Sequence, residues 1–232
     1  MQTSNDMIYL STLRKLLAFP ADDNSSGISH EIINANIAFQ PNSLLSCVDK
    51  EYVNAEIEWY ESQSLSIDSN PIIAKTRIWN NICSDTRRTV NSNYGWCTFS
   101  AENCLQYTNA VEALRRDKAS KHAVMMYSRP SIVYEWNDNF HAKSDMICTI
   151  YTQALIRNGH LIYIVNMRSN DLWFGMRNDL IWHMFIQAKM ADELGVKPGL
   201  IFWNAGSLHI YKFAHNLIKK RIKEVYNEDI GL

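Results

Sequence analysis

The chain has 232 residues, of which 47% are hydrophobic, and its formal net charge is -1. This length suits one packed domain, and the lack of a basic excess argues against a nucleic-acid partner such as duplex DNA. Its five cysteines form no C-x-x-C pair, and no histidine cluster has zinc-ligand spacing, so we expect free thiols, no metal and a reducing, cytoplasmic location. The N-terminus is a poor signal peptide, and no run of about 18 apolar residues predicts a membrane span.

The first third of the chain predicts two helices and a strand. Residues 5–18 place apolar side chains at helical spacing, and Pro20 follows the expected end of that helix. Residues 21–29 are polar and predict a loop, whereas residues 32–39 are apolar enough for a strand. Residues 49–60 again favour a helix, and a mostly polar connection follows it.

The rest of the chain mixes both element types. Residues 101–116 predict a helix with a basic last turn, and residues 180–194 predict another that ends before Gly195 and Pro198. We expect strands at residues 122–127 and 161–167, and strand material within 199–211. Because helices and strands do not alternate strictly, the order favours an α/β (α+β) fold, with a large mixed sheet and helices packed against it. No linker or repeat divides the chain, so we expect a single domain over residues 1–232.

Two segments carry chemically reactive or charged groups. Cys148 lies between apolar residues and Thr149, where it is either a buried structural cysteine or a nucleophile. Residues 166–171 and 174–179 gather arginine, amide and carboxylate groups beyond an apolar strand. Arg168 beside Ser169 suits a phosphate, because a guanidinium binds oxygens bidentately. The alternative for this segment is a salt-bridged surface loop.

From about residue 45 to residue 216 the chain resembles the thymidylate synthase family, and within it the cytidylate hydroxymethylase branch known from bacteriophages. Several ordered blocks carry the resemblance: Glu56-Ile57-Glu58-Trp59-Tyr60, Ile78-Trp79, Asn91-Ser92-Asn93-Tyr94-Gly95-Trp96, Tyr127-Ser128-Arg129-Pro130-Ser131, Met146-Ile147-Cys148-Thr149, Met167 to Asp179, and Trp203 to Tyr211.

The resemblance implies a folate-dependent enzyme whose thiolate, Cys148, adds to C6 of a pyrimidine nucleoside monophosphate and makes C5 a nucleophile toward 5,10-methylenetetrahydrofolate. Glu56 matches the glutamate that relays protons through water, although it could be an ordinary helix carboxylate and Glu58 is a close neighbour. The other matched positions are Tyr94 near the thiol, Arg168, Ser169 and Asn170 at the phosphate and substrate, His209 and Tyr211 at the sugar hydroxyl, and Trp79, Asp171 and Gly175 at the folate. Without the family, Trp79 and Tyr94 would be interpreted as core aromatics.

Asp179 indicates which pyrimidine base the site binds. Relatives that use uracil carry asparagine here, whereas a partly protonated carboxyl accepts from N4-H of cytosine and shares a proton with N3. Cytosine is therefore favoured over uracil. The competing interpretation is that Asp179 is a solvated N-cap for a helix from Leu180 onward.

The sequence is less specific about the product of the reaction and the sugar of the substrate. Thr149 departs from the synthases, which place histidine after the cysteine, so the resemblance implies water addition and 5-hydroxymethyl-dCMP; a dCMP C5-methyltransferase is the alternative. The family's two arginines from the partner subunit appear here as Lys121 and His122, and residues 22–29 hold no basic residue. This less basic phosphate site leaves CMP open as a substrate.

The resemblance also implies a homodimer, since the family pairs subunits through a sheet face and completes each phosphate site with the partner's residues. A third reading, from a different class, is a homologue that has lost catalysis and binds nucleotide or RNA as a regulator. The presence of Cys148, Glu56, Arg168 and Asp179 argues against that reading, as does the near-neutral charge.

Overall fold

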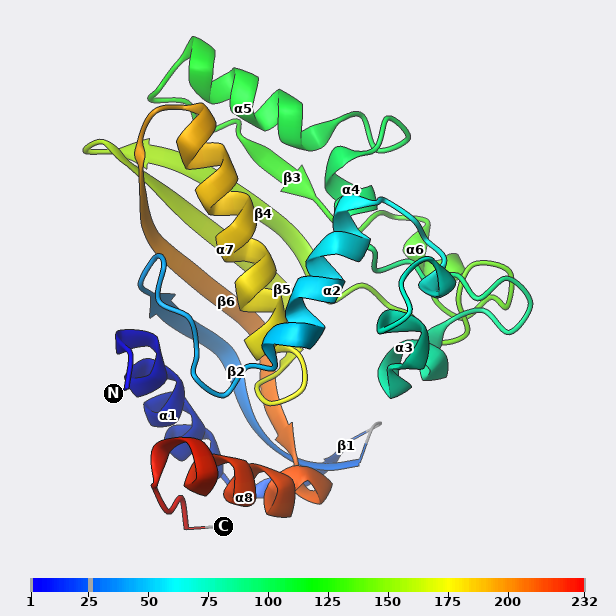
Figure 1. Cartoon of the computed structure of the whole chain (residues 1–232), viewed down its shortest axis with the longest axis vertical. Coiled ribbons are helices and arrows are strands. Elements are labelled where there is room, and N and C mark those ends of the chain that lie inside the picture. The colour runs from blue at the N-terminus through cyan, green and yellow to red at the C-terminus, as the bar shows by residue number, and fades with distance from the viewer. Residues whose placement is uncertain (1, 25–26, 232) are drawn as a thin grey trace.

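The structure is a computed structural model that describes residues 2–24 and 27–231 (Figure 1). The strands are β1 Ala21–Asn24, β2 Gly27–Phe39, β3 Val124–Met126, β4 Thr149–Arg157, β5 His160–Asp171 and β6 Lys197–Tyr211. The α-helices are α1 Ser4–Leu17, α2 Lys50–Glu61, α3 Arg77–Ile82, α4 Tyr94–Phe99, α5 Gln106–Arg116, α6 Ile132–Glu135, α7 Met176–Glu193 and α8 His215–Tyr226.

The strands form one mixed sheet in the order β1-β2-β6-β5-β4-β3, which confirms the predicted sheet type. β5 and β6 are parallel, and the other neighbouring strands are antiparallel. Parallel strands need a long crossover connection, which α7 provides as it packs over β5 and β6 (Figure 1). The segment from β5 into α7 holds six of the predicted site residues: Arg168, Ser169, Asn170, Asp171, Gly175 and Asp179.

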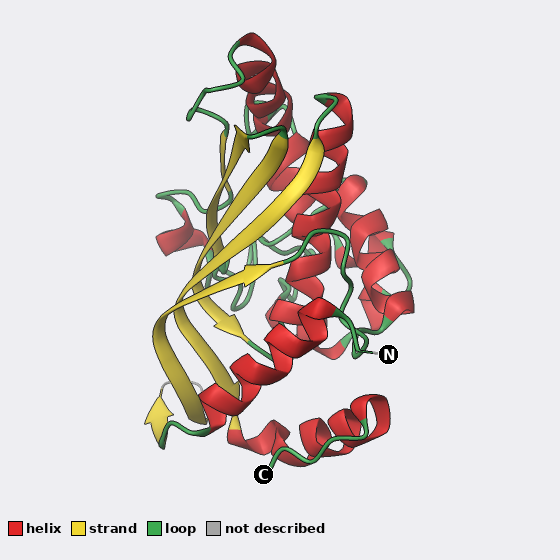
Figure 2. Cartoon of the chain, turned by 90° about the vertical axis from the view of Figure 1, so that its left-hand side faces the viewer, coloured by secondary structure: helices red, strands yellow, loops and turns green. Residues whose placement is uncertain are grey.

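Most of the helices gather on one side of the sheet (Figure 2). There α2 packs against α7 and α4, and the core between helices and sheet includes Trp59, Trp182 and Trp203, all fully buried. The strand register places Gln153, Ile164, Phe202 and Ala38 in one row across the sheet. Phe202 is 40% exposed, so this row lies on the face opposite the core and presents apolar surface.

The helices predicted at 5–18 and 49–60 are confirmed as α1 and α2, and the strand predicted at 32–39 lies within β2. The loop predicted at 21–29 is wrong: residues 21–24 pair with residues 27–30 as β1 and β2. Residues 25 and 26 of that loop lie outside the described residues. β1 is an edge strand whose side chains need not be apolar, so its polar sequence did not indicate pairing.

In the second half, the strands expected at 161–167 and 199–211 lie within β5 and β6, and the helix expected at 180–194 begins earlier, at Met176. The helix expected at 101–116 begins only at Gln106, because Cys104 and Leu105 adopt left-handed conformations that stop a helix. β3 is shorter than the strand expected at 122–127. β4 and α8 were not predicted; β4 buries Thr152 and Ala154, which are too polar or too small to mark an apolar strand face.

Candidate active site

Cys148 ends the loop that leads into β4, and Arg168 of β5 holds this loop. The backbone N–H of Arg168 donates to the Cys148 carbonyl at 2.9 Å. Its side chain donates from Nε to the Ile147 carbonyl at 3.0 Å and from Nη2 to the Met146 carbonyl at 2.6 Å. Nη2 also lies 3.6 Å from the Cys148 sulfur. One guanidinium therefore shapes the loop and faces the thiol.

Burial raises the pKa of Cys148 to about 11, although the positive charge of Arg168 acts in the opposite direction. The carboxylates of Asp179, Asp145 and Asp171 add to the increase. Burial therefore favours the protonated thiol at neutral pH.

Asp145 fixes the other end of the Cys148 loop. Its buried carboxylate accepts from the backbone N–H groups of Asn91 at 2.7 Å and Ser92 at 2.8 Å. These bonds connect Asn91 and Ser92 to the Cys148 loop, and Tyr94, at the start of α4, has a hydroxyl that interacts with Thr149 and, through its charge, with Cys148. Burial and the charges of Asp179 and Cys148 raise the pKa of the Tyr94 hydroxyl, which keeps it a neutral hydrogen-bond donor.

Asp179 lies in the first turn of α7 and faces the same region. Its Oδ2 accepts from Asn170 Nδ2 at 2.9 Å, and Asn170 Oδ1 accepts from Trp203 Nε1 at 3.2 Å. Because an indole N–H can only donate, Trp203 fixes the orientation of the Asn170 amide and directs its NH₂ at Asp179. Burial raises the pKa of Asp179 to about 7, despite the hydrogen bond from Asn170. The carboxyl can therefore hold or release a proton near neutral pH.

The alternative role of Asp179 as an N-cap is wrong. α7 begins at Met176 with Gly175 as its N-cap, so Asp179 is inside the helix. A Cβ atom at Gly175 would lie 3.1 Å from Asn170 Nδ2 and 3.2 Å from Asp179 Oδ2. A larger residue at position 175 would therefore press on the hydrogen bond that orients Asp179.

Glu56 lies on the buried face of α2, whereas Glu58 is exposed, so the structure supports the preference for Glu56. Glu56 Oε1 accepts from the Tyr52 hydroxyl at 2.6 Å, and the Tyr52 oxygen accepts from Trp79 Nε1 at 2.9 Å. Burial raises the pKa of Glu56 from 4.5 to about 8, and Asp179 adds to the increase while the bond from Tyr52 opposes it.

This raised pKa predicts a pH-dependent stability cost. Between about pH 4.5 and pH 8 the folded protein keeps a proton on Glu56 that the unfolded chain releases, so stability falls as pH rises through this window. Glu56→Gln removes the cost and keeps an acceptor for Tyr52. We expect thermal melts to show nearly equal stability of wild type and variant at pH 4.5, and a variant more stable by roughly 4–5 kcal/mol at pH 8.5.

The matched control for this prediction is Glu58→Gln, which removes an exposed carboxylate two residues away on the same helix. Its melting temperature should follow wild type at both pH values. An equal change in melting temperature for Glu56→Gln at pH 4.5 and pH 8.5 would contradict the raised pKa of Glu56.

Four further predicted residues, Ser169, Asp171, His209 and Tyr211, lie along β5 and β6. Asp171 pairs with His209 across the two strands, and the rings of His209 and Tyr211 lie 5.0 Å apart, as expected for residues on one face. Asp171 Oδ1 accepts from the backbone N–H groups of Trp173 and Phe174, both at 2.7 Å. Its buried Oδ2 has no hydrogen-bond partner within the described part of the chain. Ser169 pairs with Ser207 on the neighbouring strand.

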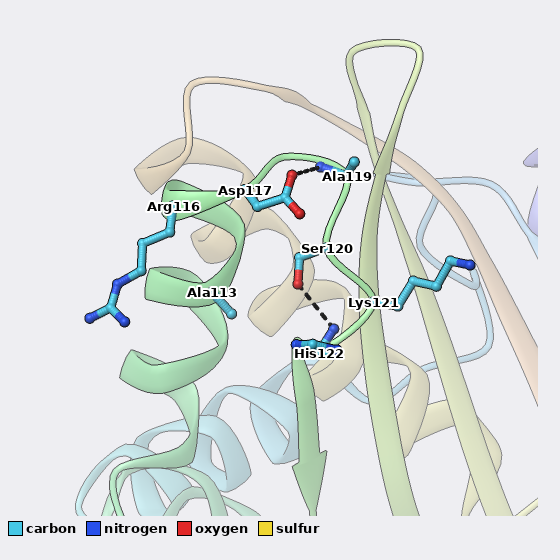
Figure 3. A pocket seen from close by; sticks show the side chains of 7 residues that line it. All are labelled: Ala113, Arg116, Asp117, Ala119, Ser120, Lys121 and His122. Atoms are coloured by element: carbon cyan, nitrogen blue, oxygen red, sulfur yellow. Dashed lines mark hydrogen bonds between the residues drawn. The ribbon is translucent and has the colours of Figure 1, made fainter.

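Within one chain, Lys121 and His122 do not lie close to the other predicted site residues. They lie between α5 and β3 and line an open pocket with Arg116 and Asp117, and Figure 3 shows Lys121 and Arg116 pointing in opposite directions. The Lys121 carbonyl accepts from Gln153, which lies five residues beyond Cys148 along β4. At the rise of a strand, this separation is roughly 17 Å.

The sequence did not point to three residues near the site: Tyr52, Glu31 and Ser207. Tyr52 is four residues before Glu56, so helical spacing alone indicates their contact. Glu31 accepts a hydrogen bond from Ser207, whose hydroxyl oxygen lies 3.3 Å from His209 Nδ1. No sequence signal links Glu31 to Ser207, because they lie on different strands far apart in the chain.

Two further features concern residues 2–24 and 27–231. No group of three or more His, Cys, Asp or Glu side chains in these ranges is arranged to hold a metal ion. No helix there is both long and apolar enough to cross a membrane.

Comparison with known proteins places these residues in context. The thymidylate synthase family model matches residues 47–229. The chain is 36% identical over 189 residues to the deoxycytidylate 5-hydroxymethyltransferases of Enterobacteria phages T4 and T2, covering 78% of this chain and 75% of each relative. It is 25% identical over 154 residues to a thymidylate synthase of Corynebacterium aurimucosum, covering 64% of this chain and 54% of that relative.

Proposed function

Because the chain belongs to the thymidylate synthase family, we propose that it transfers a one-carbon unit from 5,10-methylenetetrahydrofolate to C5 of dCMP and then adds water, giving 5-hydroxymethyl-dCMP and tetrahydrofolate. The observation that carries the proposal is the carboxyl of Asp179, oriented by the Asn170 amide at 2.9 Å, with a pKa raised to about 7 and a charge that acts on the partly buried thiol of Cys148. A group that can hold a proton at neutral pH is what N3 of cytosine requires.

In this proposal Asp179 orients and activates the base. One oxygen accepts from N4-H, and the carboxyl proton goes to N3 as electron density moves onto the ring. The Cys148 thiol passes its proton to water and its sulfur forms the Sγ–C6 bond, while the electron pair of the C5=C6 double bond moves toward the protonated N3; this makes C5 nucleophilic. Arg168, 3.6 Å from the sulfur, favours the thiolate. Its remaining N–H groups, with Ser169, are the proposed phosphate donors.

Glu56 is the proposed proton carrier. With a pKa of about 8 it can take a proton from C5 through a water molecule and return it later. Tyr94 would hold a neutral hydroxyl near the sulfur, and His209 with Tyr211 would bind the sugar hydroxyl. Hydration of the exocyclic carbon and cleavage of the Sγ–C6 bond then release the product and restore the thiol.

One carboxylate oxygen of the site is suited to bind the folate. The buried Oδ2 of Asp171, without a partner among the described residues, can accept from an N–H of a pterin ring. Trp79 and Gly175 would line the same space. When bound, methylenetetrahydrofolate would supply the one-carbon unit at the oxidation level of formaldehyde.

We further propose that residues 1–232 act as one catalytic domain, that the compartment is the reducing cytoplasm, where the five free thiols are stable, and that two copies form a homodimer. The dimer is supported by the apolar row of Ile164 and Phe202 on the sheet face away from the core. It is also supported by the position of Lys121 and His122 between α5 and β3, where the Lys121 carbonyl contacts β4 at Gln153, roughly 17 Å along the strand from Cys148.

Subunit mixing tests the shared site. Cys148→Ala and the double variant Lys121→Ala, His122→Ala should each be nearly inactive alone. After subunit exchange, each mixed dimer has one site with Cys148 and both basic residues, so about one quarter of all sites should recover. No recovery from folded, exchanged dimers would contradict sharing, and so would full activity of the double variant.

The reaction itself is tested by incubating the protein with methylenetetrahydrofolate and each of dCMP, CMP and dUMP, then weighing the products. We expect dCMP to gain the mass of CH₂O, because a hydroxymethyl group replaces the hydrogen on C5. A methyl product would indicate the methyltransferase alternative, and preferential turnover of CMP would indicate a ribonucleotide substrate. Turnover of dUMP alone would overturn the role of Asp179.

A further inference from the structure

Tyr52 links two residues of the site. It lies in the first turn of α2, four residues before Glu56, and its ring is partly buried. Its hydroxyl oxygen is 2.6 Å from Glu56 Oε1 and 2.9 Å from Trp79 Nε1. The three groups therefore form one continuous hydrogen-bond chain from α3 to the proposed proton carrier.

The direction of this chain follows from the indole. Trp79 N–H can only donate, so the Tyr52 oxygen accepts from it and the Tyr52 hydrogen is left to point at Glu56 Oε1. Because Oε1 already accepts that bond, a proton carried by Glu56 is directed to Oε2. Burial and the neighbouring Glu56 charge raise the pKa of the Tyr52 hydroxyl, so Tyr52 keeps its proton throughout the working pH range.

We propose that Tyr52 is a positioning residue for the proton relay: its hydroxyl, oriented by Trp79, holds Glu56 so that Oε2 exchanges protons with water. The inference rests on the proposed function, in which Glu56 moves protons. In this role the Tyr52 O–H bond stays intact, while Glu56 alternates between the neutral and the charged form as one proton passes to water and back.

The charge of Glu56 depends on few neighbours. The titratable groups that interact with it are Tyr52 and Tyr60 of α2 and Asp179 of α7. Tyr52 is the group that stabilises the charged form by a hydrogen bond, against burial and against Asp179. Without that bond, Glu56 would stay protonated to higher pH and its carboxyl would be free to rotate.

Tyr52→Phe keeps the ring and removes the hydroxyl. We expect kcat to fall by roughly 10-fold, which corresponds to one lost hydrogen bond to a charged group, with KM for both substrates within about 2-fold. The limb of the pH profile of kcat that reports Glu56 should move to higher pH. Fluorotyrosine at position 52 has a more acidic hydroxyl, donates more strongly, and should move the same limb to lower pH.

Two controls separate positioning from loss of structure. Tyr107→Phe removes another tyrosine hydroxyl that donates to a glutamate, Glu193 Oε1 at 2.9 Å, and should leave kcat and its pH profile unchanged. In a double-mutant cycle, Tyr52→Phe should have almost no effect on the residual rate of Glu56→Gln, because the carboxyl it positions is gone.

The inference is overturned if Tyr52→Phe lowers kcat equally in both backgrounds, or if neither Phe nor fluorotyrosine moves the pH profile. Wild-type conversion of dCMP to 5-hydroxymethyl-dCMP is measured first. If wild type makes that product and these tests fail, Tyr52 is structural and the proposed function stands; if wild type acts on no cytidylate, the proposed function itself fails.

Discussion

Cys148→Ala is expected to lower the rate of 5-hydroxymethyl-dCMP formation by at least about 10⁴-fold, because the proposed mechanism needs the Cys148 sulfur to form the bond to C6 that activates C5. The substitution removes one small, partly buried side chain, so the fold and dCMP binding should persist. The measurement is single-turnover product formation by mass spectrometry, with dCMP binding followed by calorimetry on the same sample.

The control for this prediction is Cys104→Ala, which removes an exposed thiol outside the site and should leave the rate unchanged. Alkylation adds a second readout. With a pKa of about 11, Cys148 should react slowly with iodoacetamide at pH 8 and faster toward pH 11, whereas Cys104 reacts readily. Comparable turnover by Cys148→Ala would refute covalent catalysis by this residue.

Asp179→Asn is expected to reverse the base preference. An amide cannot give a proton to N3 of cytosine, and its NH₂ would face the N4 amino group, but it can donate to O4 and accept from N3-H of uracil. We expect kcat/KM for dCMP to fall by about 100-fold or more, as for two mismatched buried hydrogen bonds, and turnover of dUMP to appear. The Asn170 amide, which donates to Asp179 Oδ2 in wild type, can donate equally to the new amide oxygen.

Asp192→Asn provides the matched control, since it makes the same substitution on the exposed side of the same helix. It should leave both substrates unaffected. A second readout is the pH dependence of dCMP turnover: the limb near pH 7 that reports Asp179 should be absent from Asp179→Asn and present in Asp192→Asn. Unchanged discrimination between dCMP and dUMP would remove Asp179 from base recognition.

Local patterns predicted the longer elements well. Helical spacing predicted α1 and α2, and apolar runs predicted the positions of β5 and β6. The wrong predictions concern strands whose side chains are polar or small, so that the sequence does not show the apolar pattern of a strand. The polar edge strand β1 was interpreted as a loop, and β4 was missed because it buries small and polar side chains such as Thr152.

The family and the candidate nucleophile follow from the amino-acid order alone, because the motifs around Cys148, Arg168 and Asp179 are recognisable along the chain. The chemical state of the site residues depends on the packed fold, which buries Glu56 and not Glu58 and raises the pKa values of Cys148 and Asp179. Motifs and periodicity are properties of neighbours along the chain. Desolvation, Coulomb interactions and the contact of Tyr52 with Trp79 depend on distances in space that only the packed fold sets.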